Sequence, residues 1–288
     1  MGSPPASVAL IANPESGGGT DPELIAGLLR SHDVEVRFGS HATADRIVVA
    51  SGDGGIAPAA AAAARAGVPL AVIPVGTAND FARGRDLPGE LEAAARLAAT
   101  GTALRALDLG WTGARPFVNA VSAGLAASAG DTASGLKSAL GPLSYLAGAV
   151  WAGLSGRPLR CSLLVDGEPF FEGNAWQVTV ADTGTFGAGS ALEPADPSDG
   201  LLDAAVMEAG SRLRLARHAY GLRSGRLTDQ PGVRHTRGAA IELTLTRAAT
   251  LNVDGELVAA GPEVRLTVEP SAFALVVPDQ EGADSPSK

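Results

Sequence analysis

The sequence has very little cysteine and no long apolar run, and both absences limit what the protein can be. The single cysteine, Cys161, excludes a disulfide-stabilised fold, and no Cys/His spacing matches a zinc site. We expect Cys161 to be buried in a strand, where a thiol behaves as a small apolar group. Residues 140–154 form the most apolar stretch, but glycine and proline interrupt it and it is shorter than the roughly 20 residues of a spanning helix. Residues 1–14 lack the pattern of a signal peptide, so we expect a cytoplasmic protein.

Positive charge is also scarce. The formal net charge is −9, which argues against a nucleic-acid partner. Residues 212–237 are the exception, because they contain seven arginines and one acidic residue. Arginine-rich segments bind phosphate or anionic lipid headgroups, although solvated arginines in local ion pairs give the same pattern. Peripheral contact with the inner face of a membrane through residues 212–237 is therefore one of two interpretations.

The chain of 288 residues is long enough for one large or two ordinary domains, each with its own core, and its 45% hydrophobic content is that of a globular protein. The first hundred residues alternate short apolar runs with alanine-rich stretches, a pattern typical of a parallel sheet covered by helices. We expect strands at residues 8–12, 34–38, 46–50 and 69–74, and helices at about 22–29 and 58–66. Only residues 39–45 separate the second and third strands. A parallel crossover needs more residues, so either a helix is missing there or that pair is arranged differently.

After residue 103 the segments become short and β-branched, which predicts an antiparallel sandwich or barrel. The expected strands are residues 160–165, 175–181, 202–207, 241–246, 250–253 and 264–268. The tetrapeptide Val-Asp-Gly-Glu occurs twice, at 165–168 and 253–256, and Asp-Gly favours a tight hairpin in both copies. The predicted organisation is an α/β domain over residues 1–103, an antiparallel domain over 104–270, a strand at 271–278 that returns to the first domain, and a disordered tail at 279–288.

Glycine and polar residues gather where two predicted strands end. Ser51-Gly52-Asp53-Gly54-Gly55 separates a strand from an alanine-rich helix, whose first N–H groups suit phosphate. A carboxylate in such a turn repels phosphate unless a metal ion or its waters lie between them. The next strand ends in Pro74-Val-Gly-Thr-Ala-Asn-Asp-Phe81, another polar loop. We expect the two loops to converge on one crevice, which suits a triphosphate and Mg²⁺ better than a nicotinamide, although a plain connecting turn has the same composition.

Five motifs, in this order, resemble the bacterial diacylglycerol kinase and lipid kinase family, which is related to the sphingosine kinases. They are Asn13-Pro14-x-Ser16-Gly17, Ser51-Gly52-Asp53-Gly54, Pro74-x-Gly76-Thr77-x-Asn79-Asp80-Phe81-Ala82-Arg83, Asp199-Gly200-x-Leu202-Asp203 and Asn252-Val253-Asp254-Gly255-Glu256. They span nearly the whole chain, and the third is the most specific. The resemblance implies an α/β nucleotide-binding domain and a β-sandwich lipid-binding domain, with the active site in the cleft between them.

The resemblance also implies an activity and residues that perform it. A kinase of this family would use ATP and Mg²⁺ to phosphorylate a lipid hydroxyl, on diacylglycerol or a related lipid, at the membrane surface. Matched positions assign nucleotide binding to Asn13, Ser16, Gly52, Asp53, Gly54, Gly76, Thr77, Asn79 and Asp80. Metal binding falls to Asp53, Asp80 and Asp108 around the catalytic Mg²⁺, and to Asp199 and Leu201 at a second, structural site found in some relatives. Asp254 would be the base that faces the lipid hydroxyl, assisted by Glu256, while Asp166 keeps only its turn role.

The chain departs from the family pattern at several positions. The family usually has Gly-Gly-Asp-Gly-Thr followed by an Asn and an acidic residue, whereas this chain has Ser51, Gly55, Ala57 and Pro58. Relatives often carry Asp at the position of Ala126. These changes remove a hydroxyl and carboxylates that could bind phosphate or metal. A non-catalytic nucleotide or lipid sensor therefore stays open as an alternative. An NAD-kinase-like phosphotransferase is a further alternative, although the loop at residues 77–83 and the Asp254/Glu256 pair argue against it, and a homodimer is left open as well.

Overall fold

The computed structural model describes residues 4–12, 21–39, 43–125, 157–183, 185–186, 190–192, 195–211 and 227–279. The chain divides into two compact units, one formed by Met1–Leu107 with Ser271–Lys288 and the other by Asp108–Pro270. Two strands, β5 (Leu104–Thr112) and β17 (Glu263–Val276), run through the boundaries between these units. Within the described ranges, no helix has the length and apolar character needed to cross a membrane. Residues 140–154 lie outside these ranges.

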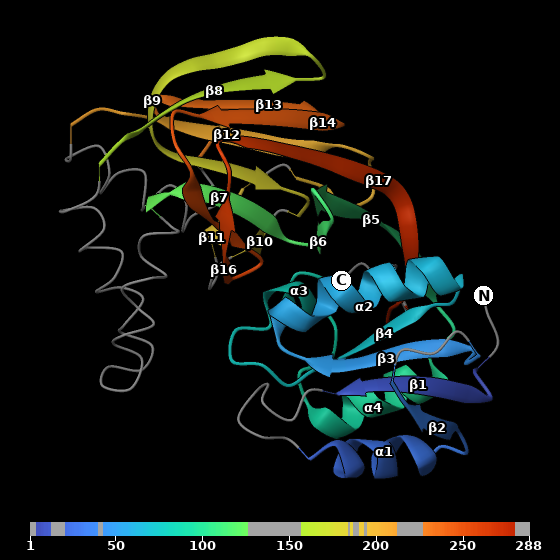
Figure 1. Cartoon of the computed structure of the whole chain (residues 1–288). Helices are drawn as coiled ribbons and strands as arrows, with labels where there is room; N and C mark the ends of the chain where they lie inside the picture. Colours follow the sequence, from blue (N-terminus) through green and yellow to red (C-terminus); the bar gives the residue numbers. More distant parts are fainter. Residues whose placement is uncertain are drawn as a thin grey trace, which may run out of the picture. The chain divides into compact units, whose positions relative to one another are not determined.

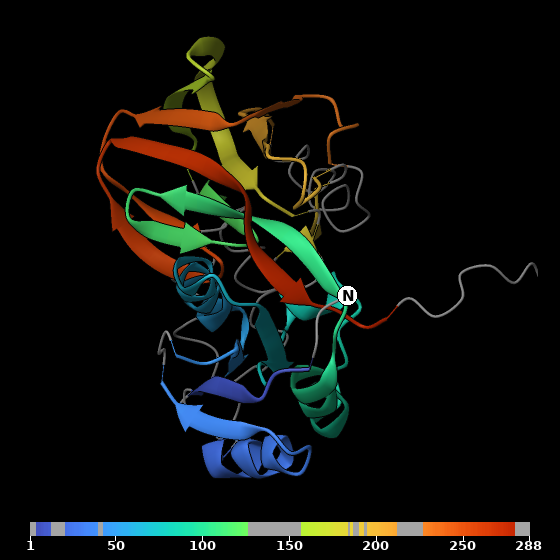
Figure 2. The same ribbon diagram turned by 90° about the vertical axis from the view of Figure 1, so that its right-hand side faces the viewer.

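The first unit is a parallel sheet with helices on both faces (Figure 1). Its elements are β1 (Ser7–Ala12), α1 (Pro22–Arg30), β2 (Glu35–Phe38), β3 (Arg46–Ser51), α2 (Asp53–Ala66), β4 (Leu70–Pro74), α3 (Asp80–Arg83) and α4 (Leu91–Thr100). The strands run in the order β4-β3-β1-β2, all parallel. Helices α1 and α4 cover one face and α2 covers the other (Figures 1 and 2). The α/β class expected for this half is confirmed.

Local sequence explains why these elements form where they do. β3 and β4 are buried along their whole length, as strands covered on both faces must be. α1 begins with Pro22 behind the cap Asp21, whose carboxylate accepts the Glu23 N–H at 2.9 Å. The buried guanidinium of Arg46 donates to two carbonyl oxygens where α4 ends, and burial lowers its pKa to about 10.

The short connection at residues 39–45 needs no helix, because β2 and β3 do not pair with each other. Both strands pair in parallel with β1, one on each side. Phe38 lies opposite Leu10 and Arg46 lies opposite Val8, so the chain returns by only two register positions while it crosses β1. Seven extended residues reach roughly 23–25 Å, which is sufficient. Of the two alternatives, the different arrangement of the pair is correct.

Helix α2 begins at Asp53, earlier than the start near residue 58 that the sequence suggested. Proline favours the first turn of a helix, which made Pro58 resemble a starting residue. The structure instead carries Pro58 inside the helix, at the cost of one backbone hydrogen bond, and the alanines beyond it are strong helix formers. The glycines at positions 54 and 55 are therefore the first turn of α2 and not a separate loop.

The second unit consists of antiparallel strands (Figure 1). Besides parts of β5 and β17, its elements are β6 (Arg115–Phe117), β7 (Ala120–Gly124), β8 (Leu159–Val165), β9 (Glu168–Ala181), β10 (Thr185–Phe186), β11 (Ser190–Ala191), β12 (Leu202–Glu208), β13 (Val233–Gly238), β14 (Ala240–Leu245), β15 (Ala249–Val253) and β16 (Glu256–Ala260). The long strand β9 pairs with β7, β8 and β12. Apolar side chains from these strands form a core around Phe117, Leu163 and Leu202. The antiparallel, sandwich-like second half is confirmed.

Two smaller expectations also have clear outcomes. Cys161 lies in β8 and is buried, as expected, and burial raises the pKa of its thiol to about 11. The segments expected at 264–268 and 271–278 are parts of one strand, β17. Near its end, Leu275 pairs in parallel with Leu70 of β4, so β17 adds to the sheet of the first unit.

Candidate functional site

Two loops follow the neighbouring parallel strands β3 and β4, and the structure brings their backbones together. A Cβ atom built on Gly76 would lie 2.5 Å from the Cα atom of Gly52. A Cβ atom built on Gly52 would lie 3.2 Å from the Cα atom of Gly76. Gly76 in particular must be glycine, because any side chain there would collide with the other loop. The two polar loops thus converge within the first unit.

The second loop is braced by its own asparagine and attached to the first loop by Asp53. Asn79 Oδ1 accepts the Gly76 N–H, and Asn79 Nδ2 donates to the Gly76 carbonyl oxygen, both at 2.9 Å. Asn79 has a φ of 50°, in the left-handed region that Asn tolerates better than most residues. Asp53 Oδ1 accepts the Phe81 N–H at 2.9 Å, which fixes the second loop against the start of α2.

The start of α2 is suited to an anion. Gly52 is the N-cap and has no side chain to bond to the first N–H groups of the helix. Such N–H groups, at the positive end of a 14-residue helix, bind phosphate well. Gly54 lies in this first turn, and Thr77 is exposed on the adjoining loop. Asn13 and Ser16, which the family resemblance adds to this site, lie outside the described residues.

Ser51 and Gly55 compete for the same space. The Oγ atom of Ser51 lies only 2.1 Å from the point where a Cβ atom on Gly55 would be. A side chain at position 55 is therefore incompatible with the serine at position 51. The two departures from the family pattern are therefore sterically linked: with a serine at position 51, position 55 has to be glycine.

The second unit holds Asp254 in a tight turn between β15 and β16. The residue has a φ of 48°, and the glycine after it has a φ of 93°. The Asp254 carboxylate accepts three backbone N–H groups: Val118 to Oδ2 at 2.8 Å, and Asn119 and Ala120 to Oδ1 at 2.9 Å each. The Asp254 N–H also donates to the Ala120 carbonyl oxygen at 3.0 Å. This side chain thus ties the hairpin to the start of β7.

Asp166, in the other Val-Asp-Gly-Glu copy, has the same arrangement. Its φ is 51°, and its two carboxylate oxygens accept the N–H groups of Ala240 at 2.8 Å and Ala239 at 3.3 Å. Its own N–H donates to the Ala240 carbonyl oxygen at 2.8 Å. Both copies therefore fasten a hairpin to the start of a neighbouring strand, which is β14 for Asp166. Turn geometry does not distinguish the two aspartates.

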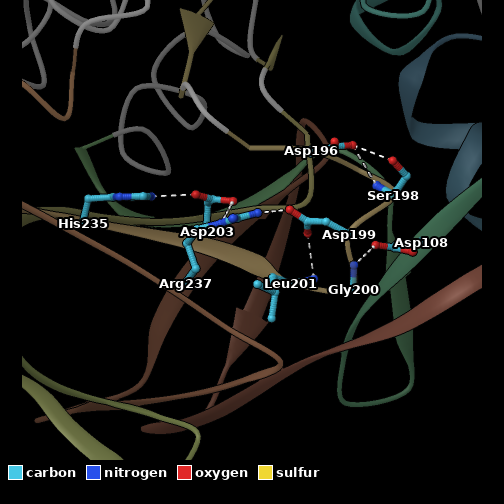
Figure 3. A network of polar contacts seen from close by, with 9 residues as sticks. All are labelled: Asp108, Asp196, Ser198, Asp199, Gly200, Leu201, Asp203, His235 and Arg237. Carbon is cyan, nitrogen blue, oxygen red and sulfur yellow. Dashed lines mark hydrogen bonds and ion pairs between the residues drawn. The ribbon is translucent and has the colours of Figure 1, made fainter.

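Glu256, two residues after Asp254, is exposed and forms an ion pair with Arg115 of β6. Asp108 has a different environment, because it is 1% exposed and belongs to the second unit. Its Oδ2 accepts the Gly200 N–H at 2.6 Å (Figure 3), and its backbone N–H donates to the Pro197 carbonyl oxygen at 2.8 Å. Asp108 therefore anchors the loop that precedes β12.

One residue of the first unit, Asp53, has an oxygen left for the catalytic cation that the family resemblance implies. Asp53 uses Oδ1 for the Phe81 N–H, while its Oδ2 meets no donor in the described part of the chain. An oxygen in that position suits a hydrated Mg²⁺ beside phosphates held at the start of α2. Asp80, the first residue of α3, is buried and pairs with Arg83. The described ranges contain no group of three His, Cys, Asp or Glu side chains that could hold a metal ion, so the joint role of Asp53, Asp80 and Asp108 stays a prediction.

The residues proposed for a second, structural metal do not fit a cation. Asp199 Oδ1 accepts the N–H of Leu201 at 3.0 Å, and Asp199 Oδ2 pairs with the guanidinium of Arg237. A divalent ion at this carboxylate would have to displace that guanidinium. Arg237 was not predicted as a functional residue, since the sequence showed only an arginine-rich segment, and the acidic partners of Arg237 lie more than 30 residues away.

Comparison with known proteins gives two family models that together match most of the chain. Residues 30–111 match the model of the diacylglycerol kinase catalytic domain. Residues 119–277 match the model of the YegS C-terminal NAD kinase beta sandwich-like domain. Solved structures show the same fold. A diacylglycerol kinase from Bacillus anthracis superposes with a TM-score of 0.76 at 20% identity, covering 96% of this chain and 98% of that one. An NAD kinase from Archaeoglobus fulgidus in complex with ATP has a TM-score of 0.55 at 15% identity, covering 95% and 94%.

Curated relatives are similar over much of their length. The "Probable lipid kinase YegS-like" of Pseudomonas fluorescens is 32% identical over 249 residues, which cover 84% of this chain and 79% of that protein. The diacylglycerol kinase of Bacillus subtilis is 31% identical over 191 residues, covering 65% of this chain and 62% of that protein. The motifs, the fold and these similarities lead to one conclusion: the chain belongs to the diacylglycerol kinase and YegS-like lipid kinase family.

Proposed function

We propose that the protein transfers the γ-phosphoryl group of ATP, with Mg²⁺, to a hydroxyl group of diacylglycerol or a related lipid. The observation that carries this proposal is the junction of the loops after β3 and β4 at the start of α2, whose first N–H groups have no side-chain cap. Such a junction suits a triphosphate. The similarity in fold to an NAD kinase solved with ATP supports the choice of nucleotide.

Backbone N–H groups of the first unit would make most of the contacts with the nucleotide phosphates. The N–H groups around Gly52 and Gly54 would hold phosphate oxygens, and the exposed hydroxyl of Thr77 would add a donor. Bound Mg²⁺ would neutralise charge on the phosphate oxygens during transfer. Asp53 would orient the hydration shell through its second oxygen, and the bond from its first oxygen to the next loop keeps it in place.

On the acceptor side, we assign the lipid hydroxyl to the turn that carries Asp254 and Glu256. In a loose phosphoryl-transfer transition state the nucleophile keeps its proton until late, so the carboxylate mainly orients the hydroxyl and accepts the proton at the end. Asp254 is rigidly placed by its backbone hydrogen bonds, which favours such a positioning role. Glu256 is exposed on the same turn and would assist.

The steric link between Ser51 and Gly55 bears on the alternative of a non-catalytic sensor. With a serine at position 51, steric fit alone accounts for the glycine at position 55. The hydroxyl missing from position 55 is therefore no sign that catalysis was lost, and it does not favour the sensor.

The direct test is transfer of label from [γ-³²P]ATP with Mg²⁺ to a panel of lipids in mixed micelles, with NAD as a separate acceptor. The proposal expects label in a lipid that carries a free hydroxyl and none in NAD. Label in NAD alone would establish the phosphotransferase alternative. ATP binding with no transfer to any acceptor would leave the sensor as the correct function.

A further inference from the structure

The loop before β12, residues 196–201, is held by polar contacts at both ends (Figure 3). At its start, Asp196 Oδ1 accepts both the N–H and the hydroxyl of Ser198, at 3.1 and 2.6 Å. Asp199 Oδ1 accepts the Leu201 N–H at 3.0 Å, which closes a turn. This turn directs the Gly200 N–H to Asp108 Oδ2, at 2.6 Å. The position of the loop therefore fixes the position of Asp108.

One guanidinium joins this loop to the adjacent strands. Arg237 of β13 donates through a terminal nitrogen to Asp199 Oδ2 and through Nε to Asp203 Oδ2 at 3.3 Å (Figure 3). Asp203 of β12 is completely buried, and its other oxygen contacts His235 Nε2 at 2.6 Å. A buried carboxylate is costly unless it is paired, and Arg237 supplies the permanent positive charge here. The flat guanidinium suits two acceptors at once.

We propose that Arg237 takes the place of a divalent cation in this loop and makes the loop independent of metal. A metal ion at Asp199 would compete with the Arg237 guanidinium for the same carboxylate oxygen. Arg237 is a positioning residue, because it acts on Asp108 only through Asp199 and Gly200. This inference rests on the contacts of the second unit and does not depend on the proposed kinase activity.

The test is the melting temperature of the full chain without nucleotide, in EDTA and in millimolar Ca²⁺ or Mg²⁺. The parent protein should melt at the same temperature in all three conditions. Arg237→Gln leaves Asp199 and the buried Asp203 without their guanidinium, so in EDTA it should melt about 5–10 °C lower. Asp199 and Asp203 then lack the positive charge that they share, so added Ca²⁺ should restore a large part of the lost melting temperature.

Arg234→Gln is the matched control. Arg234 lies on the same strand, is exposed, pairs with the half-buried Glu208 on β12 and lies over the Phe171 ring at 5.7 Å from its centroid, so its loss should lower the melting temperature less than the loss of Arg237 and create no response to Ca²⁺. If the parent itself is stabilised by Ca²⁺, and Asp199→Asn abolishes that stabilisation, a metal ion holds the loop and the inference is wrong. If Arg237→Gln fails to fold, the parent and Asp199→Asn still decide the question.

Discussion

The hydroxyl of Ser51 lies where a side chain at position 55 would begin, so these two positions cannot both carry one. From the sequence alone, Ser51 and Gly55 were separate departures that removed a hydroxyl from the phosphate site. In the structure they are sterically linked, because Ser51 at the end of β3 occupies the space beside Gly55 in the first turn of α2. At a strand-to-helix junction, the side chains of two residues four positions apart can therefore compete for the same space.

This steric link makes a prediction for a double-mutant cycle. Gly55→Thr alone should destabilise the protein by about 1–3 kcal/mol, because the new side chain collides with Ser51. The double variant Ser51→Gly, Gly55→Thr should recover most of that stability and should retain phosphoryl transfer. Thermal unfolding and the transfer assay measure the two effects. A Gly55→Thr variant as stable as the parent would show that the two positions are independent.

Among whole elements, the start of β1 depends on one carboxylate from the segment that precedes β3. Asp45 Oδ2 accepts the N–H groups of Ala6 and Ser7, at 3.0 and 2.8 Å, and the Ser7 hydroxyl at 3.0 Å. The hydrogen bonds from the Ser7 backbone and then from the Ser7 side chain lower the pKa of Asp45. The first strand of the sheet is thus fastened by an ionised group at the surface.

The lowered pKa of Asp45 gives a pH dependence with a definite sign. Because the folded-state pKa lies below the unfolded-state value, the stabilisation is present above the usual Asp range and is lost as the pH falls through the folded-state pKa. Asp45→Asn should therefore melt below the parent at pH 7, and the gap should narrow as the solution is acidified toward pH 2. Ser7→Ala should show a smaller gap, since it keeps the backbone N–H. A gap that does not change with pH would contradict this account.

The elements that follow local rules could be predicted from the sequence. The buried strands β3 and β4, the capped helix α1 and the antiparallel second half all follow from apolar pattern and turn residues. Strand β13 could not, because its arginines hide the alternation and their carboxylate partners are remote in the sequence. The order of β1, β2 and β3 also needed the structure, since the short link is possible because β3 begins, on the other side of β1, only two register positions back from where β2 ends.

In the candidate site, too, some features could be predicted from the sequence and others could not. The convergence of the loops after β3 and β4 could be predicted, because neighbouring parallel strands end at the same edge of a sheet. The bonds that hold Asp254 could not, because their donors at residues 118–120 lie more than 130 positions earlier in the chain. The equivalence of Asp166 and Asp254 in the fold also appears only when those donors are seen.

At the scale of the whole molecule, the net charge of −9 contrasts with the arginine-rich residues 212–237. Residues 212–226 lie outside the described ranges. The two remaining arginines, Arg234 and Arg237, both pair with acidic side chains. Local ion pairs therefore explain the described part of this segment, and contact with a membrane surface is a proposal that rests on the other five arginines.

Salt should reveal whether those five arginines bind an anionic surface. If they do, binding to vesicles that contain phosphatidylglycerol should weaken as ionic strength rises, because surface charges are screened beyond about 8–10 Å at physiological salt. Vesicles of phosphatidylcholine alone should bind less. Co-sedimentation at low and high salt measures both. Equal binding to the two vesicle types would show that these arginines do not recognise anionic lipid, and the proposed membrane contact would be wrong.

The proposed reaction requires groups from both units, since the phosphate-binding loops belong to one unit and the turn of Asp254 to the other. The repeated tetrapeptide provides an internal control for that requirement. Asp166 and Asp254 have the same left-handed turn, and their carboxylates accept two and three backbone N–H groups respectively, so Asp→Asn should cost each hairpin about 1–3 kcal/mol, with the larger cost at Asp254. When both variants are folded and bind ATP, a large difference in catalysis then cannot come from the turn.

The most direct measurement is therefore the rate of label transfer from [γ-³²P]ATP to lipid for Asp254→Asn and Asp166→Asn, side by side. Both variants should remain folded by circular dichroism and should bind ATP as the parent does. Asp254→Asn should lose activity by about 10²–10⁴-fold, the usual effect of removing a positioned base, while Asp166→Asn should stay close to the parent rate. Equal rates for the two folded variants would contradict the account, because Asp254 would then be a turn residue like its counterpart.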